Sequence, residues 1–303
     1  MPAATSVPRM EIAADVIISR LVAGCWRIVQ QSRGELKRVE AFIESSVECG
    51  ISAFDHADVY GRGEAQEMFG AALRARPGRR NSIQLISKCG IAPASVLSPQ
   101  HRVLHLDGSR EHIVASAERS LRALCTDHLD VFLLHRPDVL MQCEEVAEAF
   151  TQLSEQGKVR SFGVSNFSSS QFAVLQAALP FPLVTNQIEL SVLKTDALGN
   201  GVLDDIRLRG IVAMAWSPLG GGRLFTDPAN EQLINVMASV AHRYGATITA
   251  VAIAWILRLP AKITPVLGTI DPERLTQAAR GCFLDLDRQD WYEIFAAAGN
   301  SFA

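Results

Sequence analysis

Eight short apolar runs, each followed by a stretch of helical period, constrain the fold of this chain more than any other feature. They lie at residues 20–24, 51–55, 83–88, 129–135, 160–165, 183–187, 211–216 and 263–267. The stretches between them include Leu36–Cys49, Glu111–Leu124 and Glu144–Gln156, in which apolar residues recur every three to four positions. Such alternation of strands and helices is typical of a parallel sheet covered by helices.

Residues at the predicted boundaries agree with this division. Gly50, Gly157 and Gly210 follow helical runs at the position where a left-handed cap residue ends a helix. Asp271 stands before Pro272, so that its carboxylate can cap a helix whose first turn accepts the proline. These boundaries set the length of each strand–helix repeat near that of one βα unit of a barrel.

A closed barrel fits the chain better than an open doubly wound sheet. No G-x-G-x-x-G follows the first strand, and no G-x-x-x-x-G-K-[ST] is present. The segment "GVSNF" at 163–167 resembles the nucleophile elbow of hydrolases, but Phe167 stands where the second glycine is required. Barrels of 303 residues commonly form one domain, and no linker divides the chain. We therefore expect an α/β fold, a single (β/α)8 TIM barrel domain spanning residues 1–303, with its active site at the C-terminal rim.

Composition excludes several classes of partner. The formal net charge is -3 and no run of Lys or Arg is present, which argues against nucleic acid. The apolar stretch Ala246–Leu257 is shorter than the ~20 residues that span a bilayer, which argues against a membrane. The six cysteines are scattered without metal spacing, and the N-terminus lacks a signal-peptide pattern. We expect a cytoplasmic protein without a metal site; its oligomeric state stays open.

Four polar residues, Asp55, Tyr60, Lys88 and His135, lie at or just after the ends of predicted strands two, three and four. They belong to the segments "AFDHADVYG", "IQLISKCG" and "LDVFLLHRP". Singly, each is more often a turn residue, a surface charge or a core residue. A parallel barrel, however, brings the carboxyl ends of its strands to one rim, so that these four become neighbours.

Together the four groups can protonate a carbonyl oxygen. A tyrosine ordinarily has a pKa near 10 and is a reluctant acid. An ammonium beside it lowers that pKa, and a carboxylate keeps the ammonium charged and in place. Lys88 and Asp55 can fill these parts beside Tyr60, while His135 donates to the substrate oxygen. The two remaining tyrosines lie in late helical stretches, away from any predicted strand end.

Longer motifs resemble those of a known family. In order, the segments "FDHADVYG", "SKCG", "LDVFLLHRPD", "GKVRSFGVSNF", "NQIELS", "WSPLGGGRLF" and "PVLGT…ER" are similar to motifs of the aldo/keto reductase superfamily, in particular a bacterial branch of oxidoreductases. The resemblance implies NAD(P)H-dependent reduction of an aldehyde or ketone to an alcohol. Tyr60 would be the general acid and base, Lys88 and Asp55 its tuning pair, and His135 the orienting donor.

The resemblance also implies cofactor contacts, with NADPH as the expected cofactor and NADH as an alternative. Ser165, Asn166 and Gln187 match positions that hold the nicotinamide carboxamide, and Trp216 the position that stacks on the ring. The loop over the pyrophosphate would include Ser217, Leu219, Gly220, Gly221, Gly222 and Arg223.

At the adenosine end the matching positions are Gly268, Thr269, Asp271 and Arg274. Arg274 can pair with the 2′-phosphate of NADPH, whereas Asp271 would repel it if it pointed inward. We therefore expect a weaker preference for NADPH than in relatives with a basic residue at 271. A second departure is Gln66, where many relatives have a cofactor-contacting glutamate.

Trp26, Arg27, Arg136 and the loop 89–109 are the expected walls of a pocket for a small-molecule carbonyl substrate. Their mixture of apolar and basic groups leaves the substrate open. The alternative function is a dinucleotide-binding regulatory or redox-sensing subunit with little turnover, as in channel-associated members of the superfamily. Turnover of a carbonyl panel would distinguish the two.

Overall fold

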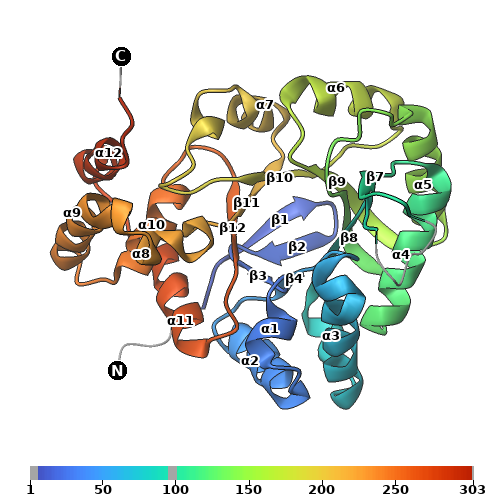
Figure 1. The fold of residues 1–303 in the computed structure, drawn as a ribbon, viewed down its shortest axis with the longest axis horizontal. Coiled ribbons are helices and arrows are strands. Elements are labelled where there is room, and N and C mark those ends of the chain that lie inside the picture. Colours follow the sequence, from blue (N-terminus) through green and yellow to red (C-terminus); the bar gives the residue numbers. More distant parts are fainter. Residues whose placement is uncertain (1–5, 95–100, 302–303) are drawn as a thin grey trace.

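A closed barrel of eight parallel strands forms the centre of the protein (Figure 1). The computed structural model describes residues 6–94 and 101–301. The barrel strands are β3 (Val22–Gly24), β4 (Ala53–Asp55), β5 (Gln84–Cys89), β8 (Leu129–Leu134), β9 (Val159–Ser165), β10 (Thr185–Glu189), β11 (Val212–Trp216) and β12 (Ile263–Leu267). β12 pairs with β3, which closes the ring. The α/β barrel prediction is confirmed, and all eight predicted strands agree within two residues at either end.

Helices surround the barrel on the outside (Figure 1). They are α1 (Ile28–Ser32), α2 (Leu36–Glu48), α3 (Glu64–Ala75), α4 (Arg110–Leu124), α5 (Cys143–Glu155), α6 (Ser169–Ala178), α7 (Val202–Arg209), α8 (Arg223–Thr226), α9 (Glu231–Arg243), α10 (Ile248–Leu257), α11 (Pro272–Arg280) and α12 (Arg288–Ala297). α9 and α12 lie together beside α10, and the indoles of Trp255 and Trp291 stack there at 4.6 Å. The layer of helices around the barrel therefore has more than one helix for each strand.

The predicted caps are confirmed. Gly50, Gly157 and Gly210 have φ of +83°, +65° and +70°, in the left-handed region where glycine is unstrained. Asp271 Oδ1 accepts the backbone N–H groups of Glu273 and Arg274, at 2.9 and 3.1 Å, and so caps α11. The carboxylate is thereby committed to the first turn of the helix.

The lower end of the barrel is closed by a feature that the strand count does not include. β1 (Arg9–Ala13) and β2 (Val16–Ser19) form an antiparallel hairpin before the first barrel strand. Its buried Ile12, Val16 and Ile18 join the core inside the barrel. The candidate site lies at the opposite end of the barrel, where the strands have their carboxyl ends.

Alternation along the strands places polar side chains above this interior core. Residues two apart in a strand point the same way, inward or outward. Inward-facing Ala53, Ile86 and Met214 are therefore followed two positions later by Asp55, Lys88 and Trp216. The carboxyl end of the barrel interior is polar because the last inward residue of several strands is polar.

Among the described residues, no single helix has the length and apolar character needed to cross a membrane. Pro228–Arg243 and Ile248–Leu257 meet that test only as a pair, and they are bent by 89° relative to each other. All six cysteines are free.

Candidate active site

The Lys88 ammonium contacts both Asp55 and Tyr60. Its Nζ donates to Asp55 Oδ2 at 2.7 Å, to the backbone oxygen of His56 at 2.8 Å and to Tyr60 Oη at 3.0 Å. The Lys88 and Asp55 side chains are 0 % and 3 % exposed. An ammonium has three N–H donors and no acceptor, so all its donors are used and Tyr60 Oη must be the acceptor. The phenol proton is thus left for another acceptor.

The loop that carries Tyr60 is fixed along β5. His56 N donates to Ile86 O at 2.8 Å, and Asp58 N donates to Lys88 O at 3.1 Å. Tyr60 then begins a single turn, Tyr60–Gly63, in which the next two residues have φ near +60°. Because the backbone before Tyr60 is held along β5 at Ile86 and Lys88, the phenol has little freedom to leave the ammonium.

His135 directly follows β8 and lies beside Tyr60. Their ring centroids are 5.8 Å apart at an interplanar angle of 75°. Burial, assisted by the positive charges of Lys88 and Arg136, lowers the pKa of His135 to about 2. Its Nδ1 is buried and has no hydrogen-bond partner in the part of the chain that the structure describes. The imidazole is therefore neutral at physiological pH and carries one N–H.

The net direction of the Tyr60 shift differs from the expectation. Burial raises the pKa of Tyr60 above 10.0, and the opposing effect of the Lys88 ammonium does not outweigh it. Burial also disfavours the charge of Lys88, but Asp55 and Tyr60 together raise the pKa of that amine. At neutral pH the site therefore holds a protonated phenol beside a charged ammonium.

A chain of hydrogen bonds joins this group to Trp216. Gln187 Nε2 donates to Asp55 Oδ1 at 2.9 Å, and the backbone oxygen of Gln187 accepts from Ser165 Oγ at 2.9 Å. Asn166 Nδ2 donates to Ser165 Oγ at 2.8 Å, and Trp216 Nε1 donates to Asn166 Oδ1 at 3.0 Å. The residues expected at the nicotinamide are thus brought together with the catalytic candidates.

The backbone is strained at two positions of this region. Asn166 and Ser217 have φ of +64° and +53° without being glycine. Non-glycine residues in the left-handed region cluster at functional sites, where the surrounding structure holds them. Trp216, which is partly buried, precedes Ser217 and donates to Asn166, and Arg136 Cζ lies 5.9 Å from the centroid of its ring.

The loop after β11 contains three successive glycines, of which Gly220 packs closely against Leu193 and Gly222 is open. Gly220, Gly221 and Gly222 have φ of +59°, +68° and +100°. A Cβ added at Gly222, or at Gly268 after β12, would meet no atom within 4 Å. Such backbone can approach phosphate oxygens closely, so the two loops fit the diphosphate and adenosine phosphate of a dinucleotide. In the same loop, Arg223 Nε donates to Gly220 O at 3.0 Å.

Beside Gly268, Thr269 Oγ1 accepts from Asp271 N at 3.1 Å. The Arg274 side chain is exposed and has no ion pair within residues 6–94 and 101–301. The Arg274 guanidinium, in the capped first turn of α11, is therefore available to an anion.

Two of the expected pocket residues are engaged with each other. The Arg27 guanidinium lies 4.9 Å from the centroid of the Trp26 ring, and its Nη2 donates to Gly221 O at 3.0 Å. Arg27 thus contacts the glycine loop, whereas Trp26 is 57 % exposed. The loop 89–109 contains a small hairpin of β6 (Ile91–Ala92) and β7 (His105–Leu106), and its residues 95–100 lie outside the described part. Assignment of these residues to a substrate pocket stays a prediction.

Gln66 lies away from the rim. It is 2 % exposed on α3, and its Nε2 donates to Ser87 Oγ at 2.7 Å and to Ser120 Oγ at 3.1 Å. Its side chain therefore joins α3 to β5 and α4. This position packs the helical layer of the fold.

Three contacts of the site are not evident from the sequence. They are the contact of Lys88 Nζ with the backbone oxygen of His56, the contact of the Gln187 amide with Asp55, and two hydrogen bonds between Gln31 and the loop after β12, one donated and one accepted by Gln31. The strand-end position of Gln187 is a signal for the second. Nothing in the local pattern around Gln31 indicates the third, because its partners are 237 and 239 positions away.

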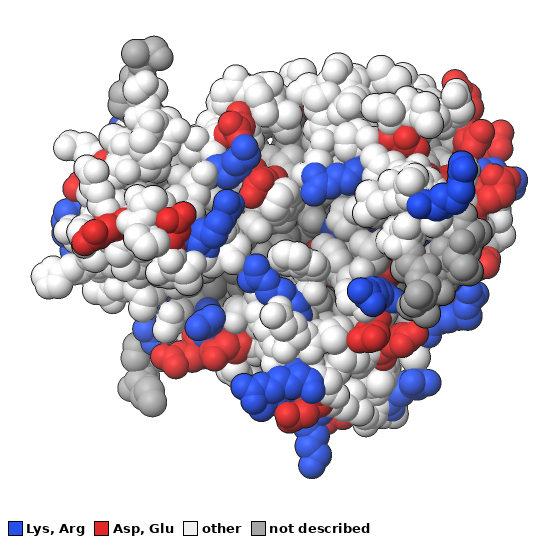
Figure 2. Space-filling view, in the orientation of Figure 1, with Lys and Arg blue, Asp and Glu red and all other residues white. Residues whose placement is uncertain are grey.

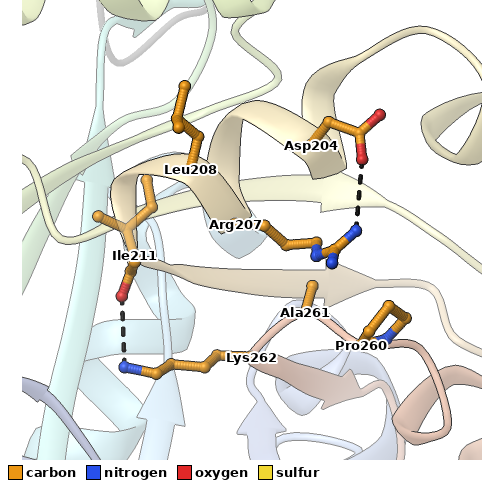
Figure 3. Close-up of a pocket in the computed structure, with 8 residues that line it drawn as sticks. Asp204, Arg207, Leu208, Ile211, Pro260, Ala261 and Lys262 are labelled. Carbon is orange, nitrogen blue, oxygen red and sulfur yellow. Dashed lines mark hydrogen bonds and ion pairs between the residues drawn. The ribbon is translucent and has the colours of Figure 1, made fainter.

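A separate surface pocket lies at the opposite end of the barrel, where β11 and β12 begin (Figure 3). Arg207 and Asp204 form an ion pair there at 3.6 Å, and Lys262 Nζ donates to Gly210 O at 3.3 Å. In the part of the chain that is described, no group of three or more His, Cys, Asp or Glu residues could hold a metal ion.

Comparison with known proteins agrees with this geometry. A sequence model described as "Aldo/keto reductase family" matches residues 20–298. The chain belongs to the aldo/keto reductase family. It is 42 % identical to a 6-dehydroglucose reductase of Agrobacterium fabrum, over 96 % of this chain and 97 % of that protein. It is 43 % identical to the Oxidoreductase YdhF of Escherichia coli, over 92 % and 93 % of the two chains.

A solved structure confirms the fold of this aldo/keto reductase. A thermostable aldo-keto reductase, crystallised with the inhibitor epalrestat, superposes with a TM-score of 0.79 at 23 % identity. The match covers 96 % of this chain and 100 % of the other. The family and its named relatives make the protein an oxidoreductase and support carbonyl reduction.

Proposed function

We propose that this aldo/keto reductase reduces an aldehyde or ketone to an alcohol with NADPH, and that Tyr60 is the general acid. The observation that carries the proposal is the contact of Lys88 with Tyr60 Oη, because it leaves the phenol proton free to be donated. The buried Asp55 keeps Lys88 charged. The neutral His135 supplies one further N–H to hold the substrate oxygen.

When bound, the reduced nicotinamide supplies the hydride that adds to the carbonyl carbon. As the carbon–oxygen π electron pair moves onto oxygen, Tyr60 gives that oxygen its proton, and the product is an alcohol. The resulting phenolate is stabilised by the ammonium of Lys88, 3.0 Å away, until solvent returns a proton. His135 donates to the same oxygen and orients the carbonyl toward the donor face.

The residues at the rim fit a nicotinamide dinucleotide. Ser165, Asn166 and Gln187 would hold the carboxamide, and Trp216 would stack on the ring. The diphosphate would lie on the loop Ser217–Arg223, including Leu219, and the adenosine phosphate beside Gly268, Thr269 and Arg274. On the face that carries α1 and α8, Lys and Arg side chains border the hollow over the barrel, with Asp and Glu side chains also at its border (Figure 2). The basic groups among them can pair with the phosphates of the cofactor.

NADPH is the preferred cofactor in this proposal, with NADH as the weaker alternative. Arg274 supplies a free guanidinium for the 2′-phosphate. Asp271 lies close by, but its Oδ1 caps α11 and its charge is partly offset by the two N–H groups that it accepts. Asp271 therefore reduces the preference for NADPH without reversing it.

A sugar bearing an aldehyde is the first substrate to test. The relative at 42 % identity over nearly the whole chain is named 6-dehydroglucose reductase. Trp26, which is largely exposed, and Arg136, which has no acidic partner in the described part of the chain, offer an apolar face and hydrogen-bond donors to a polyhydroxylated molecule. We infer that the whole chain works as one barrel domain, and a cytoplasmic location stays the expectation from its scattered cysteines.

A panel of carbonyl compounds tests the proposal. The purified protein would be mixed with NADPH or NADH and with 6-aldehydo sugars, simple aldehydes and ketones, while the absorbance of the reduced nicotinamide is followed. Turnover that is fastest with a sugar aldehyde and NADPH is the expected result. Tight cofactor binding without turnover of any carbonyl would favour the regulatory alternative instead.

A further inference from the structure

The side chain of Gln31 holds the loop after β12 by two hydrogen bonds. Gln31 Nε2 donates to Gly268 O at 3.2 Å, and Ile270 N donates to Gln31 Oε1 at 2.9 Å. The amide therefore pairs with the backbone on both sides of Thr269. A primary amide that donates and accepts at one time fixes the local geometry better than a single contact does.

Arg27 makes a corresponding contact four positions earlier. Its Nη2 donates to Gly221 O at 3.0 Å, in the glycine loop after β11. Gln31 N donates to the backbone oxygen of Arg27, the residue before α1, at 2.8 Å, so the two residues are one helical turn apart and share a face. One short segment of the first βα loop thereby reaches the two loops that we assign to the cofactor.

The segment itself is anchored to the body of the protein. Ile28 and Ser32 are fully buried, and Ile28 N donates to Cys25 O at 3.1 Å. By contrast, Gln30 on the same turn is exposed and forms no side-chain hydrogen bond within the described residues. Arg27 and Gln31 therefore extend from a fixed base.

We propose that Arg27 and Gln31 form a clasp that positions the two cofactor loops, and that Gln31 is a positioning residue for the adenosine phosphate. The proposal rests on the function proposed above. It assigns to Arg27 a place in the cofactor site, where the sequence suggests a substrate contact.

The clasp acts on the adenosine end through a short series of contacts. Gln31 fixes Gly268 and Ile270, Thr269 Oγ1 between them accepts from Asp271 N, and Asp271 caps the helix that begins before Arg274. If Gln31 loses its hydrogen bonds, this loop gains freedom that the 2′-phosphate must then remove on binding. NADPH affinity falls more than NADH affinity, because only NADPH carries that phosphate.

The test compares Gln31→Met with the matched change Gln30→Met in the full-length protein. Dissociation constants for NADPH and NADH would be measured by quenching of tryptophan fluorescence, and the rate of NADPH release by stopped flow, well below the thermal midpoint of each variant. Gln31→Met is expected to weaken NADPH binding about thirtyfold, the equivalent of about 2 kcal/mol for two neutral hydrogen bonds, and to speed NADPH release, with a smaller effect on NADH. Gln30→Met leaves all three quantities unchanged, and Arg27→Met weakens both cofactors to a similar extent.

Any other outcome contradicts the proposal that Arg27 and Gln31 form a clasp. Unchanged NADPH affinity and release in Gln31→Met would show that the hydrogen bonds are incidental. Equal losses for NADPH and NADH in Gln31→Met would show a general effect of the segment, as would the same losses in Gln30→Met. If the unmodified protein binds neither cofactor, the proposed function fails together with the clasp, and that result is seen before any variant is made.

Discussion

Lys88 is buried without solvent and yet has every N–H donor paired, which makes its contacts mutually dependent. Removing one partner of such a buried group leaves an uncompensated charge, which commonly lowers the free energy of unfolding by about 3–5 kcal/mol.

The sequence predicts Asp55, Tyr60, Lys88 and His135 as the candidate residues, because each lies at or just after a strand end. It does not predict the net pKa of Tyr60, because that depends on how deeply the phenol is buried, which composition and spacing do not give.

The pKa directions at Tyr60 and His135 predict a simple pH profile. Burial raises the pKa of Tyr60, so the phenol stays protonated through neutral pH and carbonyl reduction slows only in the alkaline range. Alcohol oxidation needs the phenolate and should rise in that range. Burial lowers the pKa of His135 to about 2, so no step near its ordinary value of about 6.5 is expected. Initial rates in both directions from pH 5 to 11 would check this; a step near pH 6.5 that is absent in His135→Gln would be contrary evidence.

Cofactor choice is a second prediction at the scale of single residues. Arg274→Ala should weaken NADPH binding by about 1.5–3 kcal/mol, the range for hydrogen bonds to charged groups, and should change NADH binding little. Asp271→Asn keeps an oxygen that can cap α11 while it removes the charge, so it should sharpen the preference for NADPH. Both are read from dissociation constants. NADH binding more tightly than NADPH in the unmodified protein would mean that Asp271 faces the ribose.

The buried Asp130 carboxylate joins three strands at the end of the barrel where the strands begin. Asp130 on β8 accepts from Arg80 Nη2 at 2.9 Å, from Leu85 N at 2.8 Å and from Arg160 Nη1 at 3.2 Å. These contacts link the starts of β5, β8 and β9. Arg80 also donates to the backbone oxygens of Ile83 and His128, so it depends on the same cluster.

Asp130→Ala should therefore destabilise the protein without touching the candidate chemistry. It leaves the mostly buried Arg80 guanidinium and the Leu85 N–H without their acceptor, which predicts a loss of about 3–5 kcal/mol in the free energy of unfolding. The measurement is urea denaturation followed by circular dichroism. Glu35→Ala is the control, since its pair with Arg38 is exposed and worth little. A loss below about 1 kcal/mol for Asp130→Ala would refute the account of this cluster.

The closing hairpin and the contacts between distant loops could not be predicted from the sequence. Met10, Ile12, Val16 and Ile18 alternate as a strand pair would, but alternation does not say that the two halves fold back and close the barrel from below. Strand positions are easier to predict because each is repeated in the same relation to a helix. Contacts between distant loops, such as Gln31 with Gly268, have no local pattern at all.

At the scale of the whole molecule, the barrel explains how residues from distant segments act together. Asp55 and Lys88 lie on adjacent strands, β4 and β5, whereas Gln187 lies on β10 and reaches Asp55 across the interior because the ring closes. The interior below them is filled by aliphatic side chains and the N-terminal hairpin, which leaves the upper rim as the polar end. The family and the fold thus support the proposal of a reductase site at this rim, with Tyr60 as its proposed general acid.

The most direct test of that claim is a single-turnover measurement of hydride transfer in Tyr60→Phe, with NADPH and a 6-aldehydo sugar. The variant keeps the ring and removes the proton donor, so the rate should fall by about 10² or more while the dissociation constant of NADPH changes little. Lys88→Met should be similarly slow, because it leaves the Asp55 carboxylate without its cation and the phenolate without its ammonium. A rate in Tyr60→Phe equal to that of the unmodified protein would contradict the account.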